Sequence, residues 1–348
     1  MPGLGYAVVA AALLAQQPPA TLTERVEVTR ILIDVRVVGD RGEAIGDLQP
    51  DDFRVRIGGK PARVESVQWV AGALTNAPAP LPAETSLAQH PAAEGRLVVF
   101  LVQTSFERGR IGGLMRTLFD SRPFLDSFTP HDRIAVLSFD SHLKIWLDFT
   151  GDLDRVREVL QSDLLVRGVP QVEASPPPSL LAGLSPARAR RYATVEASLR
   201  GLAEALAPLP GAKVVVLMGH GFGRASFSRD LAFATVSMDD YEKTLRALQD
   251  ARATIFCLDI TEADYHTLEV GLQKVSDDTG GYYERMFHFP ALAFERLAAT
   301  LAGHYVLFVE RPELKRGSHD IDIDLTRHKG TVLARRTFEV DESAARSR

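Results

Sequence analysis

A short polar turn follows an apolar strand early in the chain. Residues 97–102 are all apolar, and the turn after them reads Gln103-Thr104-Ser105-Phe106-Glu107. Hydroxyl, amide and carboxylate oxygens are the ligands that hard cations such as Mg²⁺ prefer. The composition of this strand end therefore indicates either a cation site or a polar binding surface.

A second turn of similar kind follows residues 214–218 and reads Gly219-His220-Gly221-Phe222-Gly223-Arg224. Ligands of open parallel sheets bind outside the carboxyl ends of the strands, so we expect the two turns to meet at one edge. Aromatic and arginine side chains among polar ones are typical of protein-binding hot spots. We predict a binding surface formed by Ser105, Phe106, Glu107, Arg108, His220, Phe222 and Arg224.

Two other ligands fit the second turn less well. His220 and Glu107 are suitable donors for Zn²⁺, but zinc sites use three or four side chains and no third is evident. The glycine spacing resembles a dinucleotide-binding loop, but Arg224 stands where the third glycine is needed. Neither site is favoured by the sequence.

A catalytic alternative rests on Cys257, the only cysteine of the chain. A His-Gly pair after one strand and a Cys on the next resemble a caspase-like hydrolase, with His220 as the base. A nucleophilic Cys must be exposed at a strand end with a lowered pKa. Cys257 lies within its apolar run, with Leu258 and Asp259 still to follow, which favours a role as a small core residue.

The central part of the chain alternates between apolar strands and amphipathic helices. This order predicts a parallel sheet covered on both faces. The expected strands are 97–102, 134–139, 214–218 and 254–258, and the expected helices are 114–128, 193–206, 241–251 and 291–301, the first kinked or restarted at Pro123. Residues 167–186 contain three consecutive prolines and predict a long loop.

Both ends of the chain show the period-two alternation of strands. These strands are expected at 26–38, 53–57 and 63–70, and again at 305–309, 319–325 and 332–338. Three strands at each end are too few to be stable separately, so we predict one discontinuous β-sandwich-like domain. Its parts would be 24–70 and 303–340, joined through a flexible linker at 71–95 to an α/β domain at 96–302, with a tail at 341–348.

Residues 6–15 form an apolar run that is too short to cross a bilayer, which takes about 20 residues. The run fits the core of a secretory signal peptide at 1–20, although no Lys or Arg precedes it. We therefore expect a secreted or periplasmic protein without a transmembrane anchor. The formal charge of −5 gives no general attraction to nucleic acid.

The motifs and their order resemble the bacterial secreted proteins related to the von Willebrand factor type A domain. The resemblance covers nearly the whole mature chain and is carried by residues 46–53, 132–139 and 279–283. It implies a three-layer, Rossmann-like type A domain with a β appendage. Relatives of this kind mostly bind proteins and are not generally catalysts, so the resemblance implies a non-enzymatic module.

The metal site of type A domains, carried over position by position, is altered in this chain. Gln103 stands for the first Asp, Ser105 for the first Ser, Glu107 for the second Ser and His220 for the last Asp, with Thr194 the best match for the Thr. Because two anionic ligands are lost, we expect no metal or other cofactor. If Mg²⁺ does bind, its ligands would be Ser105, Glu107 and Thr194.

The sequence thus predicts an exported, non-enzymatic module that binds an unknown protein partner at a degenerate, metal-free site. Mg²⁺-dependent, adhesion-type ligand binding is the main alternative. A Cys-His hydrolase and a purely structural envelope protein are further alternatives.

Overall fold

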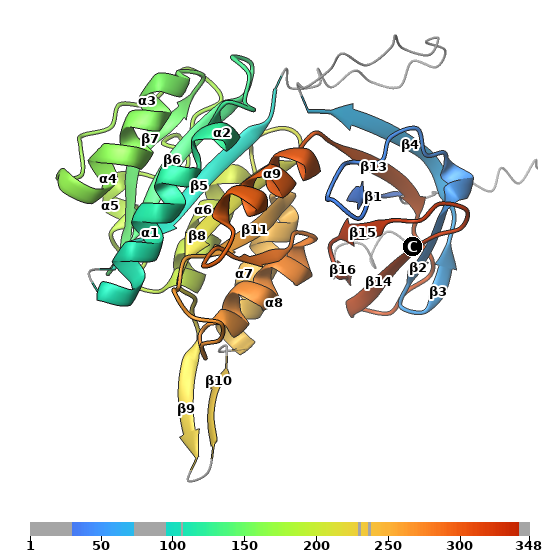
Figure 1. The fold of residues 1–348 in the computed structure, drawn as a ribbon. Coiled ribbons are helices and arrows are strands. Elements are labelled where there is room, and N and C mark those ends of the chain that lie inside the picture. The colour runs from blue at the N-terminus through green and yellow to red at the C-terminus, as the bar shows by residue number, and fades with distance from the viewer. Residues whose placement is uncertain (1–29, 73–94, 106, 229–230, 236–237, 341–348) are drawn as a thin grey trace, which may run out of the picture.

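A six-stranded sheet forms the centre of the larger part of the molecule (Figure 1). The computed structural model describes residues 30–72, 95–105, 107–228, 231–235 and 238–340. The strand order is β12-β11-β8-β5-β6-β7, in which only β7 is antiparallel to its neighbour. The strands are β5 (Leu97–Gln103), β6 (Arg133–Phe139), β7 (Leu143–Thr150), β8 (Lys213–Gly219), β11 (Ala253–Asp259) and β12 (Tyr283–Arg285).

Helices cover both faces of this sheet, which explains why β5, β8 and β11 are buried along their whole length. One face packs against α6 (Val195–Leu206), α7 (Met238–Asp250) and α8 (Glu269–Thr279). The other face packs against α1 (Arg108–Asp120), α2 (Arg122–Leu125), α3 (Leu153–Glu158) and α9 (Pro290–Thr300). The predicted three-layer α/β fold is confirmed.

The smaller part consists of two four-stranded antiparallel sheets, ordered β15-β1-β13-β4 and β16-β14-β2-β3. Segments from the two ends of the chain pair directly, because β1 lies between β13 and β15. The strands are β1 (Arg30–Val38), β2 (Phe53–Ile57), β3 (Lys60–Ala62), β4 (Val64–Ala71), β13 (Gly303–Glu310), β14 (Gly317–Leu325), β15 (Thr331–Ala334) and β16 (Thr337–Val340). One apolar core, which includes Ile33, Val55 and Leu307, joins the sheets, as a discontinuous β-sandwich-like domain requires.

Several predicted elements differ in detail from the structure. The helix expected at 114–128 is divided at Ser121, because Pro123 in the first turn of α2 lacks the N–H needed to continue α1. The strand expected at 332–338 is two strands, β15 and β16, and β7 and α8 were not predicted. The linker at 71–95, the signal peptide at 1–20 and the tail at 341–348 lie largely or wholly outside the described residues, so these boundaries stay predictions.

The predicted long loop contains no helix or strand between α4 (Leu164–Val166) and α5 (Pro186–Ala189). The carboxylate of Asp148 on β7 anchors this loop, because it accepts hydrogen bonds from Ser175 N at 2.9 Å, Ser179 Oγ at 2.6 Å and Leu180 N at 2.7 Å. Asp148 is 1% exposed, so these bonds replace the water that a buried carboxylate loses. The loop is therefore attached firmly to the antiparallel edge of the sheet.

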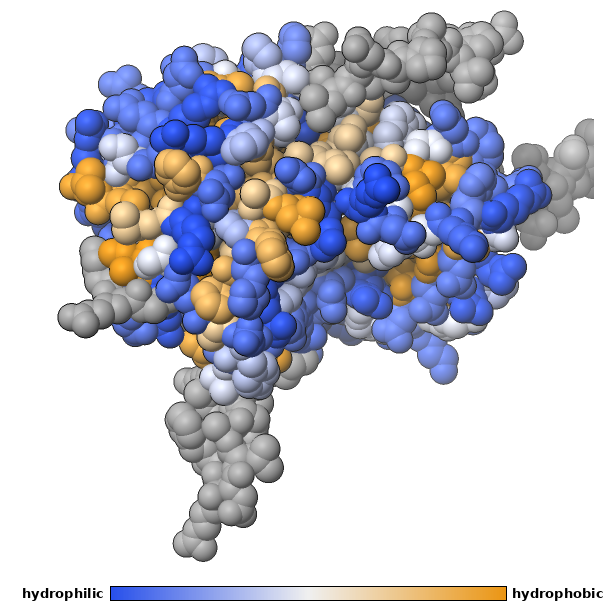
Figure 2. Space-filling model, in the orientation of Figure 1, coloured by the Kyte–Doolittle hydropathy of each residue, from blue (hydrophilic) through white to orange (hydrophobic). Residues whose placement is uncertain are grey.

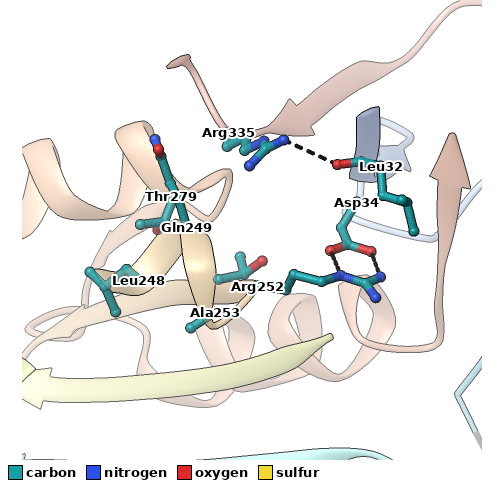
Figure 3. A pocket seen from close by; sticks show the side chains of 9 residues that line it. Leu32, Asp34, Leu248, Gln249, Arg252, Ala253, Thr279 and Arg335 are labelled. Atoms are coloured by element: carbon teal, nitrogen blue, oxygen red, sulfur yellow. Dashed lines mark hydrogen bonds and ion pairs between the residues drawn. The ribbon is translucent and has the colours of Figure 1, made fainter. Parts of the chain in front are cut away.

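A buried ionic cluster joins the β domain to the α/β domain (Figure 3). Arg252, after α7, donates to both carboxylate oxygens of Asp34 on β1, at 2.9 and 2.5 Å. Arg36 is 4% exposed, lies over the Phe256 ring at 5.4 Å and donates to Thr254 Oγ1 at 3.3 Å. Burial raises the pKa of Asp34, but the Arg252 guanidinium outweighs it and holds that pKa below its usual value. Asp34 therefore supplies the negative charge that this interface needs.

None of the helices in the described part of the chain combines the length and the apolar character needed to cross a membrane.

We expect Asp34→Asn to lower the free energy of unfolding by about 3 kcal/mol, because it leaves Arg252 and buried Arg36 without a counter-charge. Urea unfolding followed by circular dichroism measures the change. Asp324→Asn is the matched control, since Asp324 is exposed and its ion pair with Arg56 at 3.6 Å is worth under about 1 kcal/mol. Equal effects of the two variants would contradict this role of Asp34.

His304 gives the same interface a dependence on pH. Burial, and then the charge of Arg36, lower the pKa of His304 to about 4 from its usual 6.5. The unfolded chain therefore binds a proton at a higher pH than the folded chain does, so stability is complete above about pH 6.5 and falls as the pH drops towards 4. The loss amounts to about 3 kcal/mol. Urea unfolding at several pH values tests this, and a His304→Gln variant with the same slope would contradict it.

Candidate functional site

The two polar turns meet at the carboxyl edge of the sheet, where β5 and β8 lie side by side. This is the point at which the strand order reverses, because the chain runs from β5 towards β6 and later returns to β8 on the other side. A cleft of about 400 Å³ opens here. Its lining includes Gln103, Thr194, Glu196, His220, Phe222 and Asp240.

The carboxamide of Gln103 connects the two strand ends. Gln103 is the last residue of β5 and is 2% exposed. Its Oε1 accepts hydrogen bonds from His220 N at 2.9 Å and Gly221 N at 3.1 Å, and its Nε2 donates to Gly221 O at 3.1 Å. We call this three-bond arrangement the Gln103 clamp. It requires one acceptor and one donor at the same terminus, which an amide has and a carboxylate lacks.

Gly219 makes room for the clamp. A Cβ atom at this position would lie 2.0 Å from Gln103 Oε1. Glycine at the end of β8 therefore lets the backbone approach the amide, and the sequence Gly219-His220-Gly221 is explained by packing rather than by a nucleotide. The absence of the third glycine of a dinucleotide loop is consistent with this role.

The His220 ring is partly buried beside the clamp. Its Nδ1 has no hydrogen-bond partner among the residues that the structure describes. Burial, and next the nearby Arg110 guanidinium, lower the pKa of His220 to about 4. At neutral pH the imidazole is therefore uncharged. A neutral ring thus stands at the position where the metal site of type A domains has an anionic ligand.

Thr194 joins Gln103 and His220 in the cleft. It is the N-cap of α6, and its Oγ1 accepts from Ala197 N at 3.1 Å. The hydroxyl thus satisfies one of the free amide groups at the helix start. The structure brings these three predicted site residues together, as expected from the end of a long loop and two strand ends.

Ser105 and Glu107 are not among the residues that line the cleft. Ser105 Oγ accepts from Glu107 N at 3.3 Å, which makes a local turn before α1. The Glu107 side chain is 69% exposed and pairs with Arg110 at 3.3 Å. Both residues therefore belong to the start of α1, outside the cleft.

The aromatic and arginine residues of the predicted surface are either buried or outside the described part of the structure. Phe222 is 5% exposed and packs in the core, so it forms a wall of the cleft and does not project as an anchor. Phe106 lies outside the described residues, as do the side chains of Arg108 and Arg224. Phe222 therefore lies at the predicted site but is not an exposed anchor, and the binding surface stays a prediction for Phe106, Arg108 and Arg224.

The five carried-over positions do not fit a Mg²⁺ ion. The Gln103 Oε1 already accepts two backbone N–H groups, and its Nε2 presents a hydrogen where a cation needs an anion. His220 offers an imidazole, whereas Mg²⁺ prefers oxygen ligands. The clamp occupies the place where the first metal ligand would act.

Cys257 lies in the middle of β11 and is 0% exposed. Burial raises the pKa of its thiol well above the usual value, with the charge of Asp259 adding to the effect. A nucleophile requires the opposite setting, an accessible thiol with a lowered pKa. The residue fills the core, and the hydrolase alternative loses its nucleophile.

Sequence reasoning missed two groups of polar residues at this edge. Glu196 and Asp240 add carboxylates to the cleft. Asp259, His266 and Glu269 form a second cluster at the neighbouring strand end, with ligand atoms within 4.8 Å of one another. Asp259 is the last residue of an apolar strand, as Gln103 is. A search for polar residues at the end of residues 254–258 would therefore have found Asp259.

A two-stranded hairpin projects from the same edge of the sheet (Figure 1). It is formed by β9 (Arg224–Ser228) and β10 (Leu231–Thr235), which pair antiparallel. Gly223, which precedes β9, lines the cleft. The hairpin therefore begins at the cleft and extends away from the body of the molecule.

A separate apolar patch lies on the helical face of the α/β domain, where Figure 2 shows apolar residues among hydrophilic ones. Its exposed side chains come from α1 and from the start of α9. They are Met115 at 53% exposure, Phe119 at 62%, Phe289 at 71% and Leu292 at 54%. This patch is a competing surface for a partner, against which the cleft must be tested.

No protein-family model matches the chain, and no curated protein matches its sequence. Among solved structures, the chain is similar to the von Willebrand factor domain of the pilus tip protein Mfa5 from Porphyromonas gingivalis, at 11% identity and a TM-score of 0.40, over 63% of this chain and 97% of that one. It is also similar to an aerotolerance-related membrane protein from Bacteroides fragilis, at 12% identity and a TM-score of 0.39, over 60% and 98%.

Manganese-loaded TRAP protein from Plasmodium vivax is similar at 9% identity and a TM-score of 0.36, over 78% of this chain and 96% of that one. The expected type A family thus appears among the similar structures. Likenesses this distant decide nothing about function, and the fold assignment rests on the strand order and the two helical layers described above.

We expect Gln103→Ala to lower the free energy of unfolding by about 3 kcal/mol, because it leaves two backbone N–H groups and one carbonyl unpaired in the interior. Urea unfolding measures the loss. Gln171→Ala is the matched control, since Gln171 is exposed, and it should change stability by less than about 0.5 kcal/mol. A Gln103→Ala protein as stable as the control would show that the clamp contributes nothing.

Proposed function

We propose that the chain is an exported, non-enzymatic module that binds a protein segment in the cleft beside the Gln103 clamp, without a metal ion. The observation that carries this proposal is the clamp itself, which uses protein hydrogen bonds where a metal would bridge the loops and a ligand. A preformed cleft then remains at the switch point of the sheet. A protein segment can therefore bind in this cleft without an ion.

The chemistry of the cleft favours a basic segment. Glu196 and Asp240 line it, and no Lys or Arg is among the lining residues in the part of the chain that the structure describes. The imidazole of His220 is neutral at pH 7 because burial lowers its pKa to about 4. Opposite charge increases both the rate and the selectivity of association. A Lys or Arg side chain of the partner is therefore the expected occupant.

The hairpin offers a second contact for the same partner. β9 and β10 form a sheet of two strands only, so each has an outer edge with no strand partner in the described part of the chain. Unpaired strand edges bind extended peptides by adding a strand. A segment that enters the cleft would pass the start of β9, where such pairing can begin.

The competing functions receive less support. A Cys-His hydrolase needs a reactive thiol, and Cys257 is buried with a raised pKa. Mg²⁺-dependent adhesion needs anionic ligands that the clamp replaces. Export is part of the proposal and rests on the apolar run at 6–15.

Photo-crosslinking tests the location of the binding site. A photoreactive residue is placed either at Thr194, at the cleft, or at Phe119, on the apolar patch, and is irradiated in the native envelope fraction. We expect a discrete adduct from position 194 that persists in EDTA. Loss of that adduct in EDTA, or an adduct from position 119 alone, would contradict a metal-free cleft.

Charge removal tests the proposed chemistry. We expect Glu196→Gln with Asp240→Asn to weaken partner binding about tenfold, or about 1.4 kcal/mol, since the variant removes two solvent-accessible charges opposite to that of the partner. Glu204→Gln is the matched control, because Glu204 lies on the same helix and pairs with Arg188 away from the cleft. Equal affinities of the double variant and this control would overturn the basic-segment proposal.

A further inference from the structure

A second polar centre lies beside the cleft, at the carboxyl ends of β11 and β12. Asp259 ends β11, His266 follows in the next loop, and Glu269 is the first residue of α8. The side chains of Asp259 and Glu269 are 2% and 7% exposed, and that of His266 is 18% exposed. One imidazole nitrogen and two carboxylate oxygens lie within 4.8 Å of one another. The centre thus combines imidazole and carboxylate donors. It is mostly shielded from water, and its most exposed member is His266.

The two carboxylates of this centre lie close to each other, with the Tyr283 hydroxyl between them. The Tyr283 hydroxyl lies 2.7 Å from Asp259 Oδ2 and 3.2 Å from Glu269 Oε2. A hydroxyl has a single hydrogen, so it donates to only one of these carboxylates at a time. Each carboxylate oxygen still has a donor, because Thr261 and His266 serve Asp259, and Arg285 and Gln273 serve Glu269. The two carboxylates share one fixed cation among the described residues, the Arg285 guanidinium, so a second cation would balance the remaining negative charge.

Each carboxylate is also held from the outside. Thr261 N donates to Asp259 Oδ1 at 2.9 Å, which leaves Oδ2 directed at His266 Nε2, 2.6 Å away. Arg285 donates to both oxygens of Glu269, at 3.0 and 3.1 Å. Outer hydrogen bonds of this kind orient the ligands of metal sites. The donors are thus fixed in place before any ion arrives.

A further imidazole is close. Gly219 pairs with Asp259 across β8 and β11, and Ile260 N donates to Gly219 O at 2.9 Å, so His220 begins beside this strand end. The Nδ1 of His220 is buried and has no hydrogen-bond partner among the described residues. This edge of the sheet therefore holds a second imidazole nitrogen that is available to a ligand.

We propose that Asp259, His266 and Glu269 bind a zinc ion. Mixed imidazole and carboxylate donors suit Zn²⁺, whereas Mg²⁺ and Ca²⁺ favour shells of oxygen alone. Three protein ligands leave one position for water. The ion would close the loop between β11 and α8, and Leu268 of that loop lines the cleft. Zinc would therefore fix this loop, whereas partner binding beside the Gln103 clamp would not require the ion.

Calorimetric titration of the full chain, stripped of metal by a chelator, with zinc chloride tests the proposal. We expect one site of micromolar affinity or tighter, and a rise in the thermal midpoint of about 5 °C with excess zinc. His266→Gln and Glu269→Gln should each weaken binding at least about tenfold. Cobalt(II) in place of zinc should give visible absorption bands, which disappear in His266→Gln.

His288→Gln is the matched control, because His288 pairs with Asp264 at 2.8 Å on the neighbouring loop and its side chain is 59% exposed. This variant should bind zinc as the unaltered protein does. Equal zinc affinity in His266→Gln and the unaltered protein, or no binding at all, would overturn the proposal and leave the cluster a hydrogen-bonded network. Circular dichroism of each variant separates loss of the site from loss of the fold.

Discussion

The amide of Gln103 is the interaction on which the site depends. β5 and β8 diverge in their connections at this point, and each strand end leaves backbone groups without a sheet partner. One carboxamide satisfies three of these groups, and Gly219 gives it the space to do so. A metal ion would join the same two loops through charge. This chain joins them with neutral hydrogen bonds, which persist without an ion.

The shape and charge of the cleft follow from the Gln103 clamp. Because the clamp holds the loop at 219–221 in place, the His220 ring is partly buried and neutral, and Phe222 turns inward to form a wall. The remaining charge comes from Glu196 and Asp240 on the helical side. At the opposite end of the sheet, Arg252 and Asp34 fix the β domain to the helix layer, so the edge that carries the cleft is the one left open for a partner.

The fold was largely readable from the sequence, because the buried strands are continuous apolar runs and the helices have clear apolar faces. Residues 97–102 and 254–258 illustrate the first signal. The position of Thr194 followed from its place at a helix start. The clamp was not readable, because it depends on which backbone groups of the turn after β8 lie close to Gln103. The inward direction of Phe222 and the cluster around Asp259 were not predicted for the same reason: local periodicity does not encode the direction of a side chain or contacts across strands.

Hydrogen–deuterium exchange at the backbone amides of His220 and Gly221 tests the central claim most directly. If Gln103 Oε1 accepts both N–H groups, the two amides exchange slowly, and excess Mg²⁺ with EDTA as control leaves their rates unchanged. Fast exchange that becomes slow only when Mg²⁺ is added would show that an ion, and not the glutamine, closes the edge of the sheet.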